Sequence, residues 1–166
     1  MTTIKEYDIR LDALKTPILI VKKEHHLETV KELSANYDNV NKVADMMFEM
    51  FEAESLADEY VWMLCMSSSY KIIGVFEISH GSINGSILPV REIVQKALLK
   101  GAVNVIIAHN HPSGDVEPSS VDIGVTHKVS EGLNYVGLKL LDHIILGSTS
   151  YGRNYYSFNE HDLLEA

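Results

Sequence analysis

Two histidines and an aspartate stand at a spacing that suits metal coordination. His109 and His111 lie one residue apart at the end of the apolar run AVNVIIA, and Asp122 follows eleven residues after His111. Side chains two residues apart in a strand point the same way, so the two imidazoles can share one cation, and an aspartate in the first turn of a following helix can return to supply an oxygen. Two imidazoles, one carboxylate and a water are typical of an open, catalytic zinc site, in which the metal acidifies the water for attack.

Ser119 and Asp122 also have a second interpretation that needs no metal. The pattern S-x-x-D after Pro118 matches a capping box, in which Ser119 caps a helix and Asp122 returns to the N–H of the cap. A single histidine, likewise, is more often a hydrogen-bonded polar group than a metal ligand. From the residues alone, both interpretations stay open.

Other histidine-containing classes fit the pattern less well. The contiguous tripeptide HNH differs from the dispersed residues of the nucleases that carry this label. Amidohydrolase barrels also begin with H-x-H but typically need roughly 250 residues, and this chain has 166. Zinc deaminases use several cysteines, whereas Cys65 is the single cysteine here.

Composition predicts one compact domain. Of the 166 residues, 46% are hydrophobic and 22% are charged, which is typical of an α/β-type domain with its own core. No apolar run reaches the length of a membrane span, and the N-terminus lacks a signal-peptide pattern, so we expect a cytoplasmic protein. Cys65, in the run YVWMLCM, is expected to be buried and reduced. The net charge of −9 disfavours general attraction to nucleic acid.

The order of hydrophobic patterns predicts an α/β fold with a mixed sheet flanked by helices. Residues 1–38 form an N-terminal extension, with a short strand at TPILIVKK and helical turns in LETVKELSANY, and the main domain spans residues 39–166. Strands that alternate with helical patterns place helices on the faces of a sheet, and active residues of such sheets gather beyond the carboxyl ends of strands. The predicted helices cover 39–55, 88–101 and 119–137, and the predicted strands 59–67, 71–79, 102–108 and 138–147.

The combined pattern resembles a known family. H-x-H, seven residues, Ser, two residues and Asp, with an acid well upstream, resembles the signature of the JAMM (MPN-plus) metallopeptidases, and HNHPSGDVEPSSVD resembles its RadC branch. The likeness extends to PVREIVQKAL, LLDHIILG and YYSFNE, and covers roughly Glu59 to Glu160. It implies a deaminase-like three-layer domain and one zinc ion per chain, held by His109, His111 and Asp122. It also implies that the Ser119 hydroxyl stabilises the tetrahedral intermediate.

Two glutamates compete for the role of general base. Glu92 lies in the first turn of a predicted helix, where the helix dipole is sufficient to explain an acid. Glu59 stands at the entrance of an apolar strand, which is harder to explain without a function. In the JAMM pattern the upstream glutamate occupies the junction of the first helix and strand, and this resemblance favours Glu59.

Two functions follow. The ligand set and the resemblance predict a zinc-dependent hydrolase of peptide or isopeptide bonds, with a peptide or protein as substrate. The alternative is a nucleic-acid-associated accessory protein of RadC-type DNA repair or recombination, whose metal site is structural or vestigial. Many RadC proteins carry an N-terminal helix-hairpin-helix region associated with DNA, and 38 residues before the first clear helix leave little room for one.

The remaining polar residues have several interpretations. His143, in LLDHIILG, is either a hydrogen-bonded histidine near a strand end or a supporting residue beside the metal. His127 is expected at the surface or at an interface, and His25 and His26 on a solvated face. Arg91, just inside a helix start, pairs with an acid or binds a substrate carboxylate.

Overall fold

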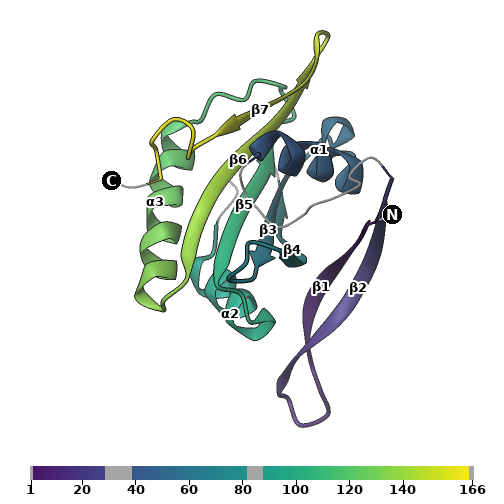
Figure 1. Ribbon diagram of the computed structural model, residues 1–166, viewed down its shortest axis with the longest axis vertical. Helices are drawn as coiled ribbons and strands as arrows, with labels where there is room; N and C mark the ends of the chain where they lie inside the picture. Colours follow the sequence, from purple (N-terminus) through teal and green to yellow (C-terminus); the bar gives the residue numbers. More distant parts are fainter. Residues whose placement is uncertain (1, 29–38, 82–87, 165–166) are drawn as a thin grey trace.

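The computed structural model describes residues 2–28, 39–81 and 88–164, which build one mixed sheet with helices on both faces (Figure 1). The seven strands lie in the order β2-β1-β4-β3-β5-β6-β7, with β1 parallel to β4, β5 parallel to β6, and the other neighbours antiparallel. The strands are β1 (Thr2–Leu11), β2 (Pro17–Leu27), β3 (Glu59–Met66), β4 (Ile72–Gly81), β5 (Asn104–Asn110), β6 (Lys139–Thr149) and β7 (Gly152–Ser157).

The helices divide the core into two halves and make the fold three-layered. The helix α1 (Val40–Phe51), followed by a short 3-10 helix η1 (Ala53–Ser55), packs on one face of the sheet, whereas α2 (Val90–Lys100) and α3 (Ser120–Tyr135) pack on the other. Alternate residues of the central strands supply the two faces. Trp62, Leu64, Ile106 and Ala108 face α1, and Val61, Met63, Val105 and Ile107 face α2 and α3.

The predicted elements of the main domain are present. The antiparallel pairing of β3 with β4 confirms the predicted hairpin. The α2 helix ends at Gly101, whose φ of 72° is the left-handed conformation that glycine adopts without strain. The buried face of α1 confirms that its methionine stripe belongs to the core. No helix within residues 2–28, 39–81 and 88–164 is long and apolar enough to cross a membrane.

The N-terminal region forms a hairpin that extends the sheet. The predicted strand TPILIVKK lies in β2, which continues to Leu27, and the hairpin joins the sheet where Glu6 and Tyr7 of β1 pair with β4. The sequence did not predict β1. The two buried positions of this strand are Ile4 and Glu6, and because the second is charged, the strand shows no clear hydrophobic alternation. The helical turns expected in LETVKELSANY fall, from residue 29 onward, outside the described residues.

A buried ionic cluster holds this hairpin against α1, and it shows that the expected solvation of His25 was wrong. His25 is 6% exposed, its Nε2 lies 3.1 Å from Oε2 of Glu6, and its ring packs on Phe51. Alternation along β2 turns His25 inward and leaves His26 exposed, as expected for His26. Lys22 Nζ lies 2.8 Å from the other oxygen of Glu6. The hydrogen bond from His25, and then Lys22, lower the pKa of Glu6 although burial acts to raise it.

Replacing Glu6 by Gln should lower the free energy of unfolding by about 1–3 kcal/mol at neutral pH, because the buried bond to His25 and the pair with Lys22 lose their charged acceptor. The pKa of Glu6 is lower in the folded chain than its ordinary value of 4.5. Its contribution is therefore complete above that value and is lost as the pH falls through the folded pKa. Denaturant unfolding of both proteins at neutral and acidic pH should show the difference shrinking in acid.

The control is Glu24→Gln, which removes the exposed Lys5–Glu24 pair of the same hairpin. Exposed pairs contribute at most about 1 kcal/mol. Equal effects of the two substitutions at neutral pH would contradict the importance of burial at Glu6.

Candidate metal centre

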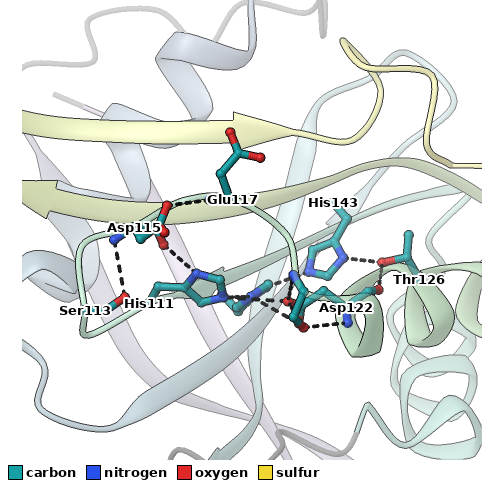
Figure 2. Close-up of polar contacts among 9 residues, drawn as sticks. His111, Ser113, Asp115, Glu117, Asp122, Thr126 and His143 are labelled. Atoms are coloured by element: carbon teal, nitrogen blue, oxygen red, sulfur yellow. Dashed lines mark hydrogen bonds and ion pairs between the residues drawn. The ribbon is translucent and has the colours of Figure 1, made fainter.

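The structure brings the three predicted ligands together at the carboxyl end of β5. His109 is buried next to the last residue of β5. His111 follows the strand, and Asp122 lies in the first turn of α3 (Figure 2). The Nε2 atoms of His109 and His111 are 3.0 Å apart. Asp122 Oδ1 lies 3.6 Å from Nε2 of His109, and Oδ2 lies 3.8 Å from Nε2 of His111. These residues form a group that could hold a metal ion.

A chain of hydrogen bonds behind His109 sets its tautomer. Thr126 Oγ1 lies 2.6 Å from the carbonyl oxygen of Asp122, which only accepts, so the hydroxyl donates there. His143 Nδ1, 2.6 Å from Thr126 Oγ1, must then be the donor to it. His143 Nε2 accepts in turn from Nδ1–H of His109 at 2.7 Å. This inferred order of donors leaves Nε2 of His109 unprotonated and directed at the other ligands.

Burial keeps both of these rings neutral. Desolvation lowers the pKa of His109 to about 4, with the charge of Asp122 acting in the opposite direction. Desolvation also lowers the pKa of His143 well below its ordinary value, and the neighbouring histidines add to this effect. A neutral imidazole is the form that binds a metal.

His111 is fixed by the loop that follows it. Its Nδ1 lies 2.6 Å from the carbonyl oxygen of Asp115, so Nδ1 carries a proton and Nε2 is the free nitrogen of the neutral ring. Its backbone N–H donates to Leu146 O of β6 at 2.8 Å. Two nitrogen lone pairs therefore face one another beside a carboxylate when both rings are neutral. A cation would relieve this arrangement, and two imidazoles with a carboxylate are a donor set that could hold a metal ion.

Glycine is required where this loop touches β6. A Cβ atom on Gly114, whose φ is 81°, would lie 2.2 Å from Ser148 O, and one on Gly147 would lie 2.5 Å from Gly114 O. The two backbones therefore approach more closely than any side chain allows. This contact explains the glycine of the Pro/Gly loop and positions Asp115 O behind His111.

The capping-box interpretation of Ser119 and Asp122 is confirmed, and it is compatible with a metal site. Asp122 Oδ2 accepts from the N–H of Ser119 at 2.8 Å and from its hydroxyl at 2.5 Å, while Ser119 Oγ accepts from Asp122 N at 3.1 Å. These bonds use Oδ2, and Oδ1 is the carboxylate oxygen nearest to His109. The cap thus orients the carboxylate toward the histidines.

His143 is a buried, hydrogen-bonded histidine in the middle of β6 rather than near its end, and it lies directly behind the candidate ligand His109. Its ring stacks on Phe158 with centroids 4.7 Å apart. The buried Asp142 carboxylate holds this segment in place by accepting from Ser157 Oγ at 2.6 Å and from Asn159 N at 3.0 Å. The late motif YYSFNE therefore packs behind the site. It begins in β7, which hydrophobic patterning did not predict, and continues past the end of that strand.

Glu59, the expected base, begins β3 at the same end of the sheet as the histidines. It is half-buried, and the register Val61↔His109 in the antiparallel β3–β5 pair places it two residues further toward His111. Residues at even spacing along a strand share a face, so Glu59 is on the face of Val61, which packs toward α2 and α3.

Other sequence candidates lie elsewhere. Glu92 and Arg91 are exposed on α2 and line a pocket of about 370 Å³ with Asp8 of β1. In the sheet, β4 and β3 lie between β1 and β5, the strand that carries the histidines. His127 is half-buried, with Nε2 3.2 Å from Leu163 O. Cys65 is buried as expected, and burial raises the pKa of its thiol to about 12.

A mixed sheet between helix layers, with an H-x-H pair at a strand end and an aspartate at the next helix start, defines a domain of the JAB/MPN class. The chain belongs to the RadC-like JAB domain family, which it matches over residues 37–163.

Several curated relatives are named UPF0758 proteins. The chain is 38% identical to the one from Alkaliphilus oremlandii over 122 residues, which are 74% of this chain and 50% of the relative. It is 36% identical to the one from Clostridium tetani over 129 residues, 78% of this chain and 55% of the relative. The chain thus spans about half the length of these relatives.

Thr126→Val should weaken zinc binding by roughly 10- to 100-fold, the usual effect of removing a group that orients a ligand. Valine keeps the shape of threonine but cannot accept the N–H of His143, so the tautomer of His109 is no longer fixed. Competition with a chromophoric chelator would measure the affinity. Ser130→Ala, at a buried polar position one turn further along α3, is the control and should leave the affinity unchanged. Equal zinc affinities of wild type and Thr126→Val would contradict the proposed order of hydrogen bonds.

Proposed function

We propose that the chain is a zinc-dependent hydrolase of peptide or isopeptide bonds. The observation that carries the proposal is the convergence of two oriented Nε2 atoms, 3.0 Å apart, with the carboxylate of Asp122. Two nitrogens at roughly 2.0–2.1 Å from one zinc ion, in tetrahedral geometry, would lie roughly 3.3 Å apart. The observed separation needs little adjustment.

His109 Nε2, His111 Nε2 and Asp122 Oδ1 would hold the ion, and three protein ligands leave a position for water or substrate, as in catalytic rather than structural zinc sites. Zinc supplies Lewis acidity and makes water a stronger acid. The His109 side chain is 3% exposed, whereas those of His111 and Asp122 are 17% and 14% exposed. A substrate would therefore approach from the side of His111 and Asp122.

Glu59 would act as general base and then as general acid. Its carboxylate would take a proton from the attacking water and deliver it to the leaving nitrogen, which an amide requires because an amine anion is a poor leaving group. The register of β3 with β5 supports this role, because it brings Glu59 to the same face and end of the sheet as the histidines. The position of Glu92 beside β1 supports Glu59 over Glu92.

Ser119 would donate a hydrogen bond to the substrate oxygen as negative charge develops there. Its side chain is exposed at the start of α3, next to Asp122. Rotation about the Cβ–Oγ bond would redirect the hydroxyl hydrogen from Asp122 Oδ2 to a bound carbonyl oxygen, while Oγ keeps the bond that it accepts from Asp122 N. One such donor contributes roughly 10²- to 10³-fold to the rate in enzymes that use it.

The zinc-loaded protein should contain one zinc ion per chain, and His111→Ala should lose most of its affinity for zinc. Removing a ligand should cost more than the roughly 10- to 100-fold effect of an orienting residue. Elemental analysis and a chelator titration give both values. His127→Ala, on α3 but outside the ligand group, should bind zinc like wild type. Full zinc affinity in His111→Ala would show that the ligand set is misassigned.

Glu59→Gln should bind zinc normally and lose roughly 10²- to 10⁴-fold in kcat, the range for a general base. The measurement uses fluorescently labelled casein and a glycyl-lysine isopeptide, with and without a chelator. Glu92→Gln is the matched control and should keep full turnover. Loss of turnover in Glu92→Gln alone would transfer the role to Glu92, and absence of chelator-sensitive hydrolysis in wild type would contradict the proposed activity.

A further inference from the structure

Asn110 joins the strand of the metal ligands to the strand that begins with Glu59. It lies between His109 and His111 in the sequence, and the residue is 1% exposed. Its Oδ1 accepts from the N–H of Tyr60 at 2.7 Å, and its Nδ2 donates to the carbonyl oxygen of Asp58 at 3.0 Å. The two partners are the residues immediately before and after Glu59.

These two bonds fix the backbone on both sides of Glu59. The regular β3–β5 pairing runs from Met66↔Asn104 to Val61↔His109, and Glu59 lies two residues beyond its last pair. There the amide of Asn110 continues the connection between the strands in place of backbone groups. The carboxamide carries its acceptor and its donor on separate atoms and so bonds both residues at once, whereas Asp lacks the donor and Ala lacks both.

We propose that Asn110 is a positioning residue that sets the location of the Glu59 carboxylate relative to the metal ligands. The inference rests on the proposed function, in which Glu59 is the base. The side chain that lies between the two ligands in the sequence then determines where the base begins β3, because it holds the residues on either side of Glu59. Misplacement of a reacting group by about 1 Å can cost roughly 10²-fold in rate, so the catalytic contribution of Asn110 should exceed its contribution to folding.

Asn104 provides a matched control for a merely structural role. It is also buried, at 6% exposure, at the opposite end of β5, and its Nδ2 donates to Ser67 O at 3.1 Å. Both asparagines thus connect β5 to the β3–β4 hairpin through backbone atoms. Only Asn110 does so beside Glu59.

The test compares Asn110→Ala, Asn104→Ala, Glu59→Gln and the Asn110→Ala/Glu59→Gln double variant in the zinc-loaded chain. Asn110→Ala should bind one zinc ion with an affinity within about threefold of wild type and lose roughly 10²-fold in kcat at unchanged KM. The double variant should be no slower than Glu59→Gln alone, because both changes remove the same function. Asn104→Ala should keep its kcat.

A second readout does not require turnover. In the cobalt(II)-loaded protein, the pH dependence of the visible spectrum reports the ionisation of groups beside the metal. Glu59→Gln should remove or shift the transition, Asn110→Ala should shift it in the same direction, and Asn104→Ala should leave it at the wild-type pH. If Asn110→Ala does not fold, Asn110→Ser, which keeps one polar group, should show the same shift.

The outcomes separate the two proposals. If Glu59→Gln alters kcat and the cobalt transition while Asn110→Ala and Asn110→Ser match Asn104→Ala, the positioning role of Asn110 is overturned and the base assignment stands. If Glu59→Gln changes neither quantity, the assignment of Glu59 and the inference about Asn110 are both overturned. Loss of zinc affinity in Asn110→Ala equal to that in His111→Ala would also overturn the inference, because Asn110 would then serve the ligands rather than the base.

Discussion

The site depends on one constraint, which is that both histidines carry their proton on Nδ1. For His109 the proton is fixed by His143 and Thr126, and for His111 by the carbonyl oxygen of Asp115. Both Nε2 atoms consequently face the same point, where repulsion between lone pairs favours a cation. Much of the surrounding structure, including the glycine contact between Gly114 and Gly147, serves to place these hydrogen-bond acceptors.

The capping box at the start of α3 also orients a candidate metal ligand. Ser119 and Asp122 satisfy free N–H groups at the start of α3, as such pairs do at many helix starts. Because Asp122 Oδ2 accepts two bonds from Ser119, the carboxylate has a fixed orientation, with Oδ1 toward His109. A helix start is therefore a suitable source for a metal ligand. Its stability and the orientation of the ligand depend on the same bonds.

Features that depend on residues close together in the sequence could be predicted from it. Contacts that depend on the pairing of distant strands could not. H-x-H on a strand and S-x-x-D at a helix start are local patterns, so the ligand group could be predicted. The alternation of strand and helix patterns is also local, and it predicted helices on the faces of a sheet. Thr126 stands one helical turn after Asp122 and could have been found by that spacing. His25 could not, because its partner Glu6 belongs to β1, whose buried acid hides the hydrophobic alternation. The bonds from Asn110 to the residues beside Glu59 likewise depend on the β3–β5 register.

The hydrogen bonds behind the site form a ring that returns to its starting residue. From the carbonyl oxygen of Asp122 the bonds pass through Thr126 and His143 to His109, whose Nε2 faces the carboxylate of Asp122. A cation between His109 and Asp122 would close the ring and join α3 to β5 and β6. Because a metal that binds only the folded state would add to folding stability, its affinity and the packing of α3 would be thermodynamically linked. Changes that loosen α3 should therefore weaken the metal site even when they leave its ligands in place.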